Sequence, residues 1–335
     1  MDAERPQVGA DAHPPALAVR LGGRAVDASR GADRLLEAAA RLDAAGVDAL
    51  LWAAPGEDDT TPALDPALLS ATVAAATARI GLVVPVDAGR DAPFTVARRL
   101  AALDHLSGGR AAWRLRGGTA GRRRELVDVV TALWDSFDDG AMVRDRETAR
   151  YYRPEGLRTP HHRGPDFTVR GPLNVSRPPQ GHPPLVVDGS VPEDLAGVDV
   201  VVGRELPGDR SAGDGADAAG RRGAAPSPTP RLPRRWVPVA VGAGSPPPSP
   251  AAFRRALAEA GADGVLLLVR DPEGLDAAVV AAASWPGAAE SRATTLRQRL
   301  GLPRPPARAR RPAPDVERPV VPRRPAPSTT AEDAR

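Results

Sequence analysis

The stretch AGVDALLW at 45–52 has two further copies in this chain, AGVDVVVG at 196–203 and AGADGVLL at 260–267. Each copy has a glycine, an aspartate two residues later, and then a run of apolar residues. Glycine readily adopts the left-handed conformation that ends a helix, and a nearly continuous apolar run is typical of a parallel strand covered on both faces. Helix-to-strand joints that recur along the chain therefore predict repeated β/α units, as in a barrel or a doubly wound sheet.

Eight apolar segments are candidate strands, and most of them precede a segment whose apolar residues have helical spacing. Two of the expected helices begin at Asp65-Pro66 and Ser249-Pro250, where an N-cap side chain precedes a proline in the first turn. This pattern predicts an α/β fold, a (β/α)8 TIM barrel, in which a loop replaces the helix of the sixth β/α unit. The candidate strands are 17–22, 47–52, 79–86, 111–116, 184–189, 198–203, 236–242 and 264–269.

Composition divides the chain into one folded body and flanking segments. Residues 17–302 are predicted to form the barrel, because their apolar runs are regular enough to build a core. The N-terminal 1–16, the loop 204–234 inside the barrel and the Pro/Arg-rich tail 303–335 are predicted to be disordered or flexible, since proline, glycine and charged residues dominate them.

Composition also limits the class of function. The 335 residues include no cysteine, which excludes disulfides and cysteine-ligated metal sites, and all 45 basic residues are arginine. No apolar segment reaches the length of a membrane span and the first residues lack a secretory core, so no membrane contact and a cytoplasmic location are expected. Nucleic-acid binding is not expected, because no aromatic residues interleave with the arginines of 303–324.

Four longer segments resemble one enzyme family. RIGLVVPVDAGRDAPFTVARRLAALDHLSGGRAAW at 79–113 resembles the third strand, third helix and fourth strand of the luciferase-like flavin-dependent monooxygenases. The likeness continues in order through LVDVVTALWDSFDDGAMVRDRETARYY at 126–152, HHRGPDFTVRGPLNVSRPPQGHPPLVVDGS at 161–190 and TTLRQRLGLPRP at 294–305. Together these segments resemble the subgroup of nitrilotriacetate and dibenzothiophene-sulfone monooxygenases.

This resemblance implies a TIM-like barrel that binds reduced FMN, supplied by a separate flavin reductase, and oxygenates a small organic substrate with O2. The protein's part would be to bind and orient the flavin and to exclude water from it. Deazaflavin F420, or no cofactor, is the alternative. Barrels of this type pair through helices next to the second and third strands, so a homodimer or a heterodimer with a paralogue is also implied.

The resemblance assigns flavin binding to the carboxyl ends of the barrel strands, at Ala54, Asp87, Arg114, Gly189 and Ser190. Only Gly189 and Ser190 keep the residue types of the family, where a hydroxyl and a backbone N–H would suit a phosphate. Alanine replaces an acidic residue at Ala54 and arginine replaces an amide at Arg114. The carboxylate of Asp87 replaces a hydroxyl and would repel a phosphate.

Two functions are compatible with a preserved scaffold and altered cofactor positions. The first is an FMN-dependent monooxygenase, in which Arg114, Arg116 and the arginines at 122–124 rebuild the phosphate site. The second is a catalytically inactive barrel that serves as a partner or regulatory subunit of an active paralogue.

The remaining polar residues add one catalytic candidate and no metal site. His162 is interpreted either as a structural loop histidine or as a proton donor to the flavin, and no other catalytic residue is assigned. The tandem pair His161-His162 does not form a chelating face. Asp135, Asp138, Asp139 and Asp145 lack the spacing of a calcium loop and are interpreted as a solvated acidic turn.

Overall fold

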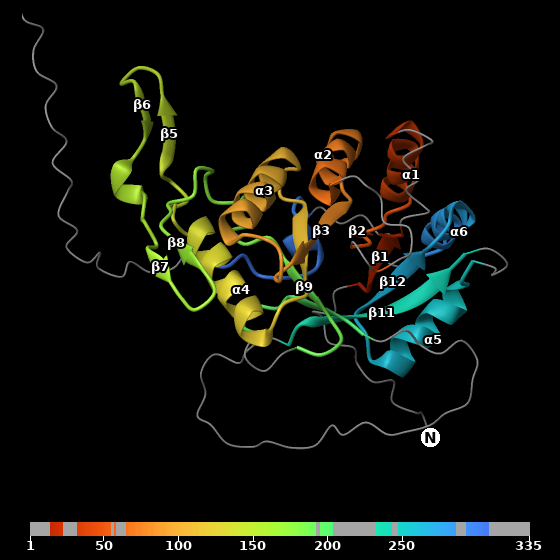
Figure 1. Cartoon of the computed structure of the whole chain (residues 1–335). Helices are drawn as coiled ribbons and strands as arrows, with labels where there is room; N and C mark the ends of the chain where they lie inside the picture. The colour runs from red at the N-terminus through yellow and green to blue at the C-terminus, as the bar shows by residue number, and fades with distance from the viewer. Residues whose placement is uncertain are drawn as a thin grey trace, which may run out of the picture.

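The computed structural model describes residues 14–22, 32–54, 57, 65–191, 195–203, 232–242, 247–285 and 293–307. Within these residues, eight parallel strands close into a barrel in the order β1-β12-β11-β10-β9-β4-β3-β2 (Figure 1). The predicted TIM-like α/β barrel is therefore confirmed. Its strands are β1 Ala16–Leu21, β2 Ala49–Trp52, β3 Gly81–Asp87, β4 Ala111–Arg116, β9 Leu185–Asp188, β10 Val200–Val202, β11 Arg234–Val241 and β12 Gly264–Val269.

Helices cover the outside of the barrel. The caps expected from the sequence are present, because the side chains of Asp65 and Ser249 accept hydrogen bonds from the N–H groups of Ala67 (2.8 Å) and Ala252 (3.2 Å). No described helix is long and apolar enough to cross a bilayer. The helices are α1 Ala32–Ala44, α2 Pro66–Ala76, α3 Pro93–Leu106, α4 Ala120–Trp134, α5 Pro250–Ala260, α6 Pro272–Ala283 and α7 Leu296–Arg299.

Three segments were predicted to be disordered or flexible: residues 1–16, the loop 204–234 and the tail 303–335. Most of each segment lies outside the described residues. The helix of the sixth β/α unit would fall in the same loop, and the described residues between β10 and β11 contain no helix. Residues 303–307 begin the predicted tail but contact the barrel, because Arg304 binds Asp139 and the carbonyl of Pro305 accepts from Arg177.

The glycines of the repeated phrase end helices or turns in the left-handed conformation, as predicted. Gly46, Gly197 and Gly261 have φ angles of 84°, 79° and 53°. In addition, each aspartate of the phrase links the start of its strand to the neighbouring strand of the barrel. Asp48, Asp199 and Asp263 accept backbone N–H groups of Leu17 (3.0 Å), Leu185 (2.9 Å) and Arg235 (2.9 Å).

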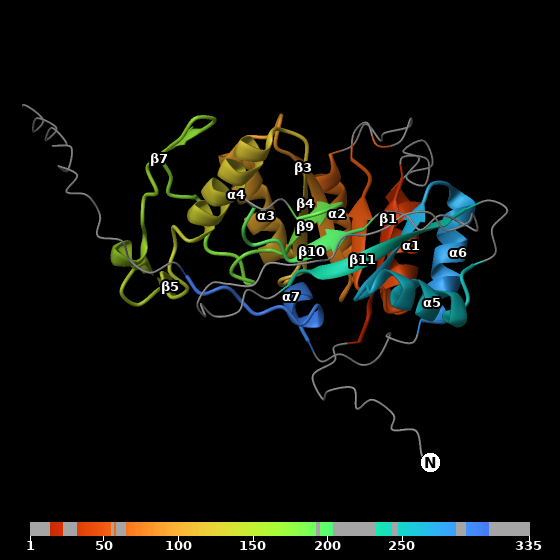
Figure 2. The same cartoon turned by 90° about the horizontal axis from the view of Figure 1, so that it is seen from below.

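Helix α7, which the sequence analysis did not predict, closes the amino end of the barrel (Figure 2). Leu296 and Leu300 are buried against the apolar residues that point into the barrel. Arg297 of α7 also binds the residue that precedes β10: its Nη1 and Nη2 atoms donate to the carboxylate of Asp199 at 2.9 and 2.8 Å. The amino end is therefore packed, and only the carboxyl ends of the strands are left to form a site.

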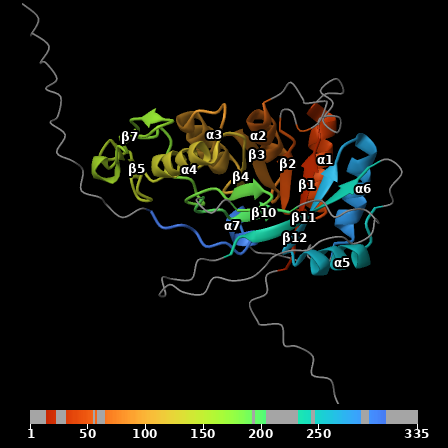
Figure 3. The ribbon, with the colours of Figure 1, turned by 60° about the horizontal axis from the view of Figure 1, so that its bottom comes forward.

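An irregular excursion between α4 and β9 carries two small antiparallel hairpins. They lie together at one end of the molecule beside α4, with α5 and α6 at the opposite end (Figure 3). A short strand was predicted within FTVRG and is confirmed as β8. The hairpins are β5 Met142–Asp145 with β6 Arg150–Tyr152, and β7 His162–Arg163 with β8 Thr168–Val169.

Candidate functional site

The carboxyl end of the barrel holds a cluster of charged side chains centred on Arg114 of β4. Its Nε and Nη2 atoms donate to Oδ2 of Asp188, at the end of β9, at 2.9 and 2.6 Å. Its Nη1 and Nη2 atoms donate to Oε2 and Oε1 of Glu57, in the segment after β2, at 2.8 and 2.5 Å. Arg20 of β1 lies 3.9 Å from Glu57. One guanidinium therefore joins two carboxylates from different parts of the barrel rim.

Strand alternation explains why Arg114 points inward. Ala112 belongs to the apolar layer inside the barrel, whereas Trp113 and Leu115 pack outward against the helices. Arg114 shares the inward face with Ala112, and its side chain is only 4% exposed. A guanidinium in such a place requires ionic partners, which Glu57 and Asp188 supply.

The cluster favours the charged forms of Arg114 and Glu57. Burial opposes ionisation of Arg114, but the hydrogen bonds and charges of Glu57 and Asp188 outweigh it and raise the pKa of Arg114. Burial would likewise raise the pKa of Glu57, but Arg114 and the N–H of Ala54 outweigh it and lower that pKa. Neither group is poised to exchange a proton near neutral pH.

Ala54, a position that the resemblance assigns to the flavin, instead supports the cluster. It is buried, and its N–H donates to Oε2 of Glu57 at 2.9 Å. The N–H of Glu57 in turn donates to the carbonyl of Ala54 at 3.0 Å. Glu57 was not identified from the sequence, although an acidic residue shortly after the second strand, where the family has one, was an available signal.

Asp87, the second assigned position, is engaged in its own loop. Its Oδ1 accepts the N–H of Gly89 at 2.8 Å, and its own N–H donates to Asp91 at 2.7 Å. The carboxylate packs closely against Gly117, where an added Cβ would come 2.8 Å from Cγ of Asp87. This packing requires glycine at the turn and holds the carboxylate at the end of β3.

Gly189 and Ser190 retain the residue types of the family but differ in availability. Gly189 has a φ of 78°, and its N–H donates to the carbonyl of Val202 at 2.8 Å. That N–H is consequently occupied within the barrel and does not point to a phosphate. Ser190 is exposed at the rim.

His162 contacts a buried carboxylate of α4. Its Nε2 lies 2.8 Å from Oε1 of Glu125, whose carboxylate also accepts the N–H groups of Asp166 and Phe167 at 2.9 Å. Against the effect of burial, these hydrogen bonds lower the pKa of Glu125. The contacts favour the interpretation of His162 as a structural residue that anchors the β7–β8 hairpin to α4.

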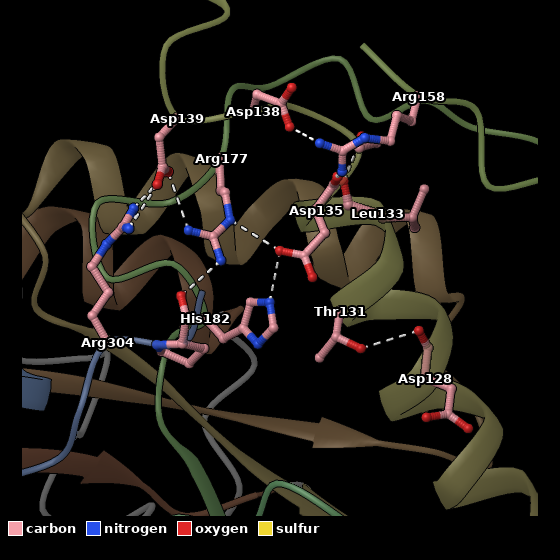
Figure 4. A network of polar contacts seen from close by, with 12 residues as sticks. Asp128, Thr131, Leu133, Asp135, Asp138, Asp139, Arg158, Arg177, His182 and Arg304 are labelled. Carbon is pink, nitrogen blue, oxygen red and sulfur yellow. Dashed lines mark hydrogen bonds and ion pairs between the residues drawn. The ribbon is translucent and has the colours of Figure 1, made fainter. Parts of the chain in front are cut away.

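The acidic residues after α4 form a second network, drawn in Figure 4. Asp135 accepts from Nε of Arg177 at 2.9 Å and lies 3.0 Å from Nε2 of His182. Arg304 donates to both carboxylate oxygens of Asp139 at 2.8 and 2.7 Å. A solvated acidic turn was predicted here; this is wrong for Asp135, whose side chain is 3% exposed, because local spacing did not reveal its distant partners.

A cavity of about 270 Å³ lies beside the carboxyl end of the barrel, its mouth, between α2, α3 and the end of β3. Its lining combines apolar and charged residues, and this volume lies just below the roughly 300–1,000 Å³ typical of small-molecule sites. The described residues contain no group of His, Cys, Asp or Glu suited to hold a metal ion. The lining includes Ala54, Val84, Asp87, Arg90, Val96, Arg99, Leu100 and Arg116.

Arg114, Asp188 and Gly189 do not fit a flavin in this arrangement. Arg114 and Asp188, which point inward from β4 and β9, bind each other, and the N–H of Gly189 is used by the barrel. A ligand that bound Arg114 directly would have to break these bonds and leave buried charges unpaired.

Comparison with known proteins identifies relatives of the whole barrel. The model of the luciferase-like monooxygenase family matches residues 16–197. The B subunit of pristinamycin IIA synthase from Streptomyces pristinaespiralis is 37% identical over 298 residues, which cover 88% of this chain and 97% of that protein. The A subunit of the same synthase is 35% identical over 151 residues, 39% of this chain and 31% of that protein.

Other relatives are similar over a smaller part. Nitrilotriacetate monooxygenase component A of Aminobacter aminovorans is 40% identical over 162 residues, 43% of this chain and 35% of that protein. Among solved structures, a riboflavin lyase with modified FMN and riboflavin has a TM-score of 0.65 at 20% identity, covering 88% of this chain and 97% of that one. An EDTA monooxygenase from Chelativorans has a TM-score of 0.60 at 18% identity, covering 88% and 100%. These two likenesses concern the fold, and the sequence matches confirm the predicted family and monooxygenase class.

Proposed function

Because the chain belongs to the luciferase-like monooxygenase family, we propose that it is one subunit of a two-subunit flavin-dependent monooxygenase acting on a small organic substrate. In this proposal the partner is a paralogous barrel that binds reduced FMN, and a separate flavin reductase supplies the flavin. This chain supplies a structural scaffold and the contacts to the partner barrel, and the partner binds the flavin.

The observation that carries this proposal is the ion cluster at the mouth of the barrel. Arg114 is bound by Glu57 and Asp188 through five hydrogen bonds, counting both carboxylate oxygens of each partner. Removing one member of a buried ion pair is strongly unfavourable, typically by about 3–5 kcal/mol. A flavin would therefore have to compete with contacts that the folded protein already satisfies.

The pattern of relatives supports the same conclusion. The B subunit of a synthase matches this chain over 88% of the chain and 97% of its own length. The nitrilotriacetate enzyme and the A subunit of that synthase, in contrast, match over about a third of their own length. A chain that resembles a B subunit over nearly all of that subunit's length is expected to work beside an A subunit.

The faces of α2 and α3 offer a surface for such pairing, as the resemblance to luciferase-type barrels implies. Leu68 of α2 is 69% exposed and Leu106 of α3 is 71% exposed. Large apolar side chains that water surrounds in the single barrel become buried when a partner covers the helices.

The first experiment is an anaerobic titration of the purified chain with reduced FMN, followed by tryptophan fluorescence. We expect no saturable binding, and we expect an FMN-binding luciferase-like paralogue from the same genome to saturate under identical conditions. A second assay mixes the paralogue, a flavin reductase and NADH with or without this chain, and product formation should depend on the chain. Micromolar binding of reduced FMN by this chain alone would instead mean that its own mouth is a flavin site.

A further inference from the structure

The cavity between α2 and α3 is separate from the ion cluster in the mouth of the barrel. The two helices lie side by side outside β3, and the cavity of about 270 Å³ lies between them and that strand (Figure 1). Val84 and Val86 line it, and both point outward from β3 toward the helices. Arg114, Glu57 and Asp188 do not line it. A ligand held in the cavity would therefore leave the ion cluster intact.

Apolar side chains from three elements provide the body of the cavity. β3 contributes Val84 and Val86, and α3 contributes Val96 and Leu100, each no more than 7% exposed. Ala67 contributes from α2, and its small side chain leaves the space open. Covering this apolar surface favours binding, and the volume suits a compact molecule of roughly ten non-hydrogen atoms.

The charged residues that line the cavity cancel one another. Three arginines and three aspartates contribute to the lining: Arg90, Arg99, Arg116, Asp65, Asp87 and Asp91. Asp65 accepts the N–H of Ala67 at 2.8 Å and lies 3.3 Å from Arg99. An ion of either sign would meet groups of its own sign here, which opposes binding. The balance of charge therefore favours a neutral ligand.

Three polar side chains of the lining retain hydrogen-bonding capacity. Arg90 is exposed and forms no ion pair with a described residue. Oδ2 of Asp91 accepts the N–H of Asp87 at 2.7 Å, but its Oδ1 has no partner in the described part of the chain. The hydroxyl of Thr95 is likewise unused within the described ranges. Together they offer a donor, an acceptor and a group that can do both, which matches an amide.

We propose that the cavity between α2 and α3 binds a small neutral organic molecule, with its apolar body against β3 and an amide or similar donor–acceptor group toward Arg90 and Asp91. The site goes beyond the proposed function, because it requires neither flavin nor the paralogue. Ala54 lines the cavity and its N–H donates to Glu57 at 2.9 Å. An occupied cavity thus adjoins the ion cluster without competing for its bonds.

The test uses three probes of one size and shape that differ in charge: benzamide, benzoate and protonated benzamidine. Binding to the full chain is measured near neutral pH, without flavin, by saturation-transfer NMR and calorimetry. Benzamide should bind saturably with a Kd of about 1 mM or lower, as expected for a ligand of this size. Benzoate and benzamidine should each bind about fivefold more weakly or worse, because each brings an uncompensated charge.

Variants of the lining locate the binding. Ala67→Phe fills the cavity and should weaken benzamide binding by about tenfold or more. Ala75→Phe is the matched control on the same helix, because Ala75 is exposed and does not line the cavity. Thr95→Val is a milder second variant that keeps the shape and removes the hydroxyl, and it should weaken binding by about three- to tenfold. Circular dichroism checks that each variant is folded.

Two single substitutions test the balance of charge. Arg90→Met leaves one excess negative charge and should shift the ratio of the two Kd values by about fivefold in favour of benzamidine over benzoate. Asp91→Asn keeps an acceptor for the N–H of Asp87 and should shift the ratio by a similar factor toward benzoate. Opposite shifts from neighbouring residues are expected only if both side chains face the bound probe.

Three results would overturn the inference. The first is no saturable binding of benzamide up to about 10 mM. The second is benzamide binding that Ala67→Phe leaves unchanged, which would place the probe elsewhere. The third is tighter binding of benzoate than of benzamide by the unmodified chain, which would make the cavity an anion site. None of these results bears on the two-subunit function, which is tested with flavin and the paralogue.

Discussion

The substitution Arg114→Met tests the cluster at the mouth of the barrel most directly. Methionine keeps an unbranched, flexible side chain and removes the charge, so Glu57 and Asp188 remain without their shared partner. Their side chains are 16% and 42% exposed. Breaking a buried ion pair from one side typically lowers stability by about 3–5 kcal/mol, and because water reaches Asp188 we expect about 2–4 kcal/mol here.

The assay is equilibrium unfolding in guanidinium chloride, monitored by tryptophan fluorescence. A matched triple variant, Arg114→Met with Glu57→Gln and Asp188→Asn, also removes the two unpaired carboxylate charges. It should recover most of the free energy of unfolding that the single variant loses. A decrease below about 1 kcal/mol for the single variant would mean that solvent already screens the cluster. A triple variant as unstable as the single one would show that lost packing, and not charge, dominates.

The pH dependence of the same variant has a defined sign. The pKa of Glu57 is lowered from its usual 4.5 in the folded state. The contribution of Glu57 is therefore present above pH 4.5 and disappears as the pH falls through the lowered folded value. Arg114→Met should remove this loss on acidification, which unfolding curves between about pH 3 and pH 6 measure.

Three further outcomes are expected from features elsewhere in the barrel. Arg297→Met should lower the free energy of unfolding by about 2–4 kcal/mol, because it breaks the two-pronged contact with Asp199 that holds α7. Burial raises the pKa of Asp104 from 3.8 to about 6. The contribution of Asp104 to the free energy of unfolding should therefore fall by about 3 kcal/mol as the pH rises from 3.8 to about 6. Unfolding curves of the wild type and of Asp104→Asn across this pH range measure the difference. Gly261→Ala, at a φ of 53°, should destabilise by about 1 kcal/mol in thermal unfolding, whereas Gly121→Ala inside α4 should be neutral or stabilising.

The barrel was predictable because its signals are local in sequence. The glycine of each repeated phrase, the Asp-Pro and Ser-Pro helix starts and the apolar runs each act within a few residues. The eight predicted strands coincide with the eight strands of the barrel to within about two residues at their ends. The excursion after α4 was less predictable, because its hairpins are short and exposed and show no apolar alternation.

The candidate site was predictable only in part. The resemblance pointed to Ala54 and Arg114, and both lie at the mouth. Their roles could not be read from the sequence, because the partners of Arg114 lie 57 residues before it and 74 residues after it in the chain. Nothing in the sequence indicated that the carbonyl of Val202 would occupy the N–H of Gly189.

By itself, the sequence determined the β/α repeat, the helix ends and the family, because turn chemistry and apolar periodicity are properties of neighbouring residues. Only the tertiary structure decided that Arg114, Glu57 and Asp188 meet, since closure of the barrel sets which strand ends become neighbours and which side chains face inward. The same closure placed the aspartates of the repeated phrase beside the backbone of adjoining strands. Electrostatic pairing at the mouth is thus a consequence of strand order and register, which no short stretch of sequence specifies.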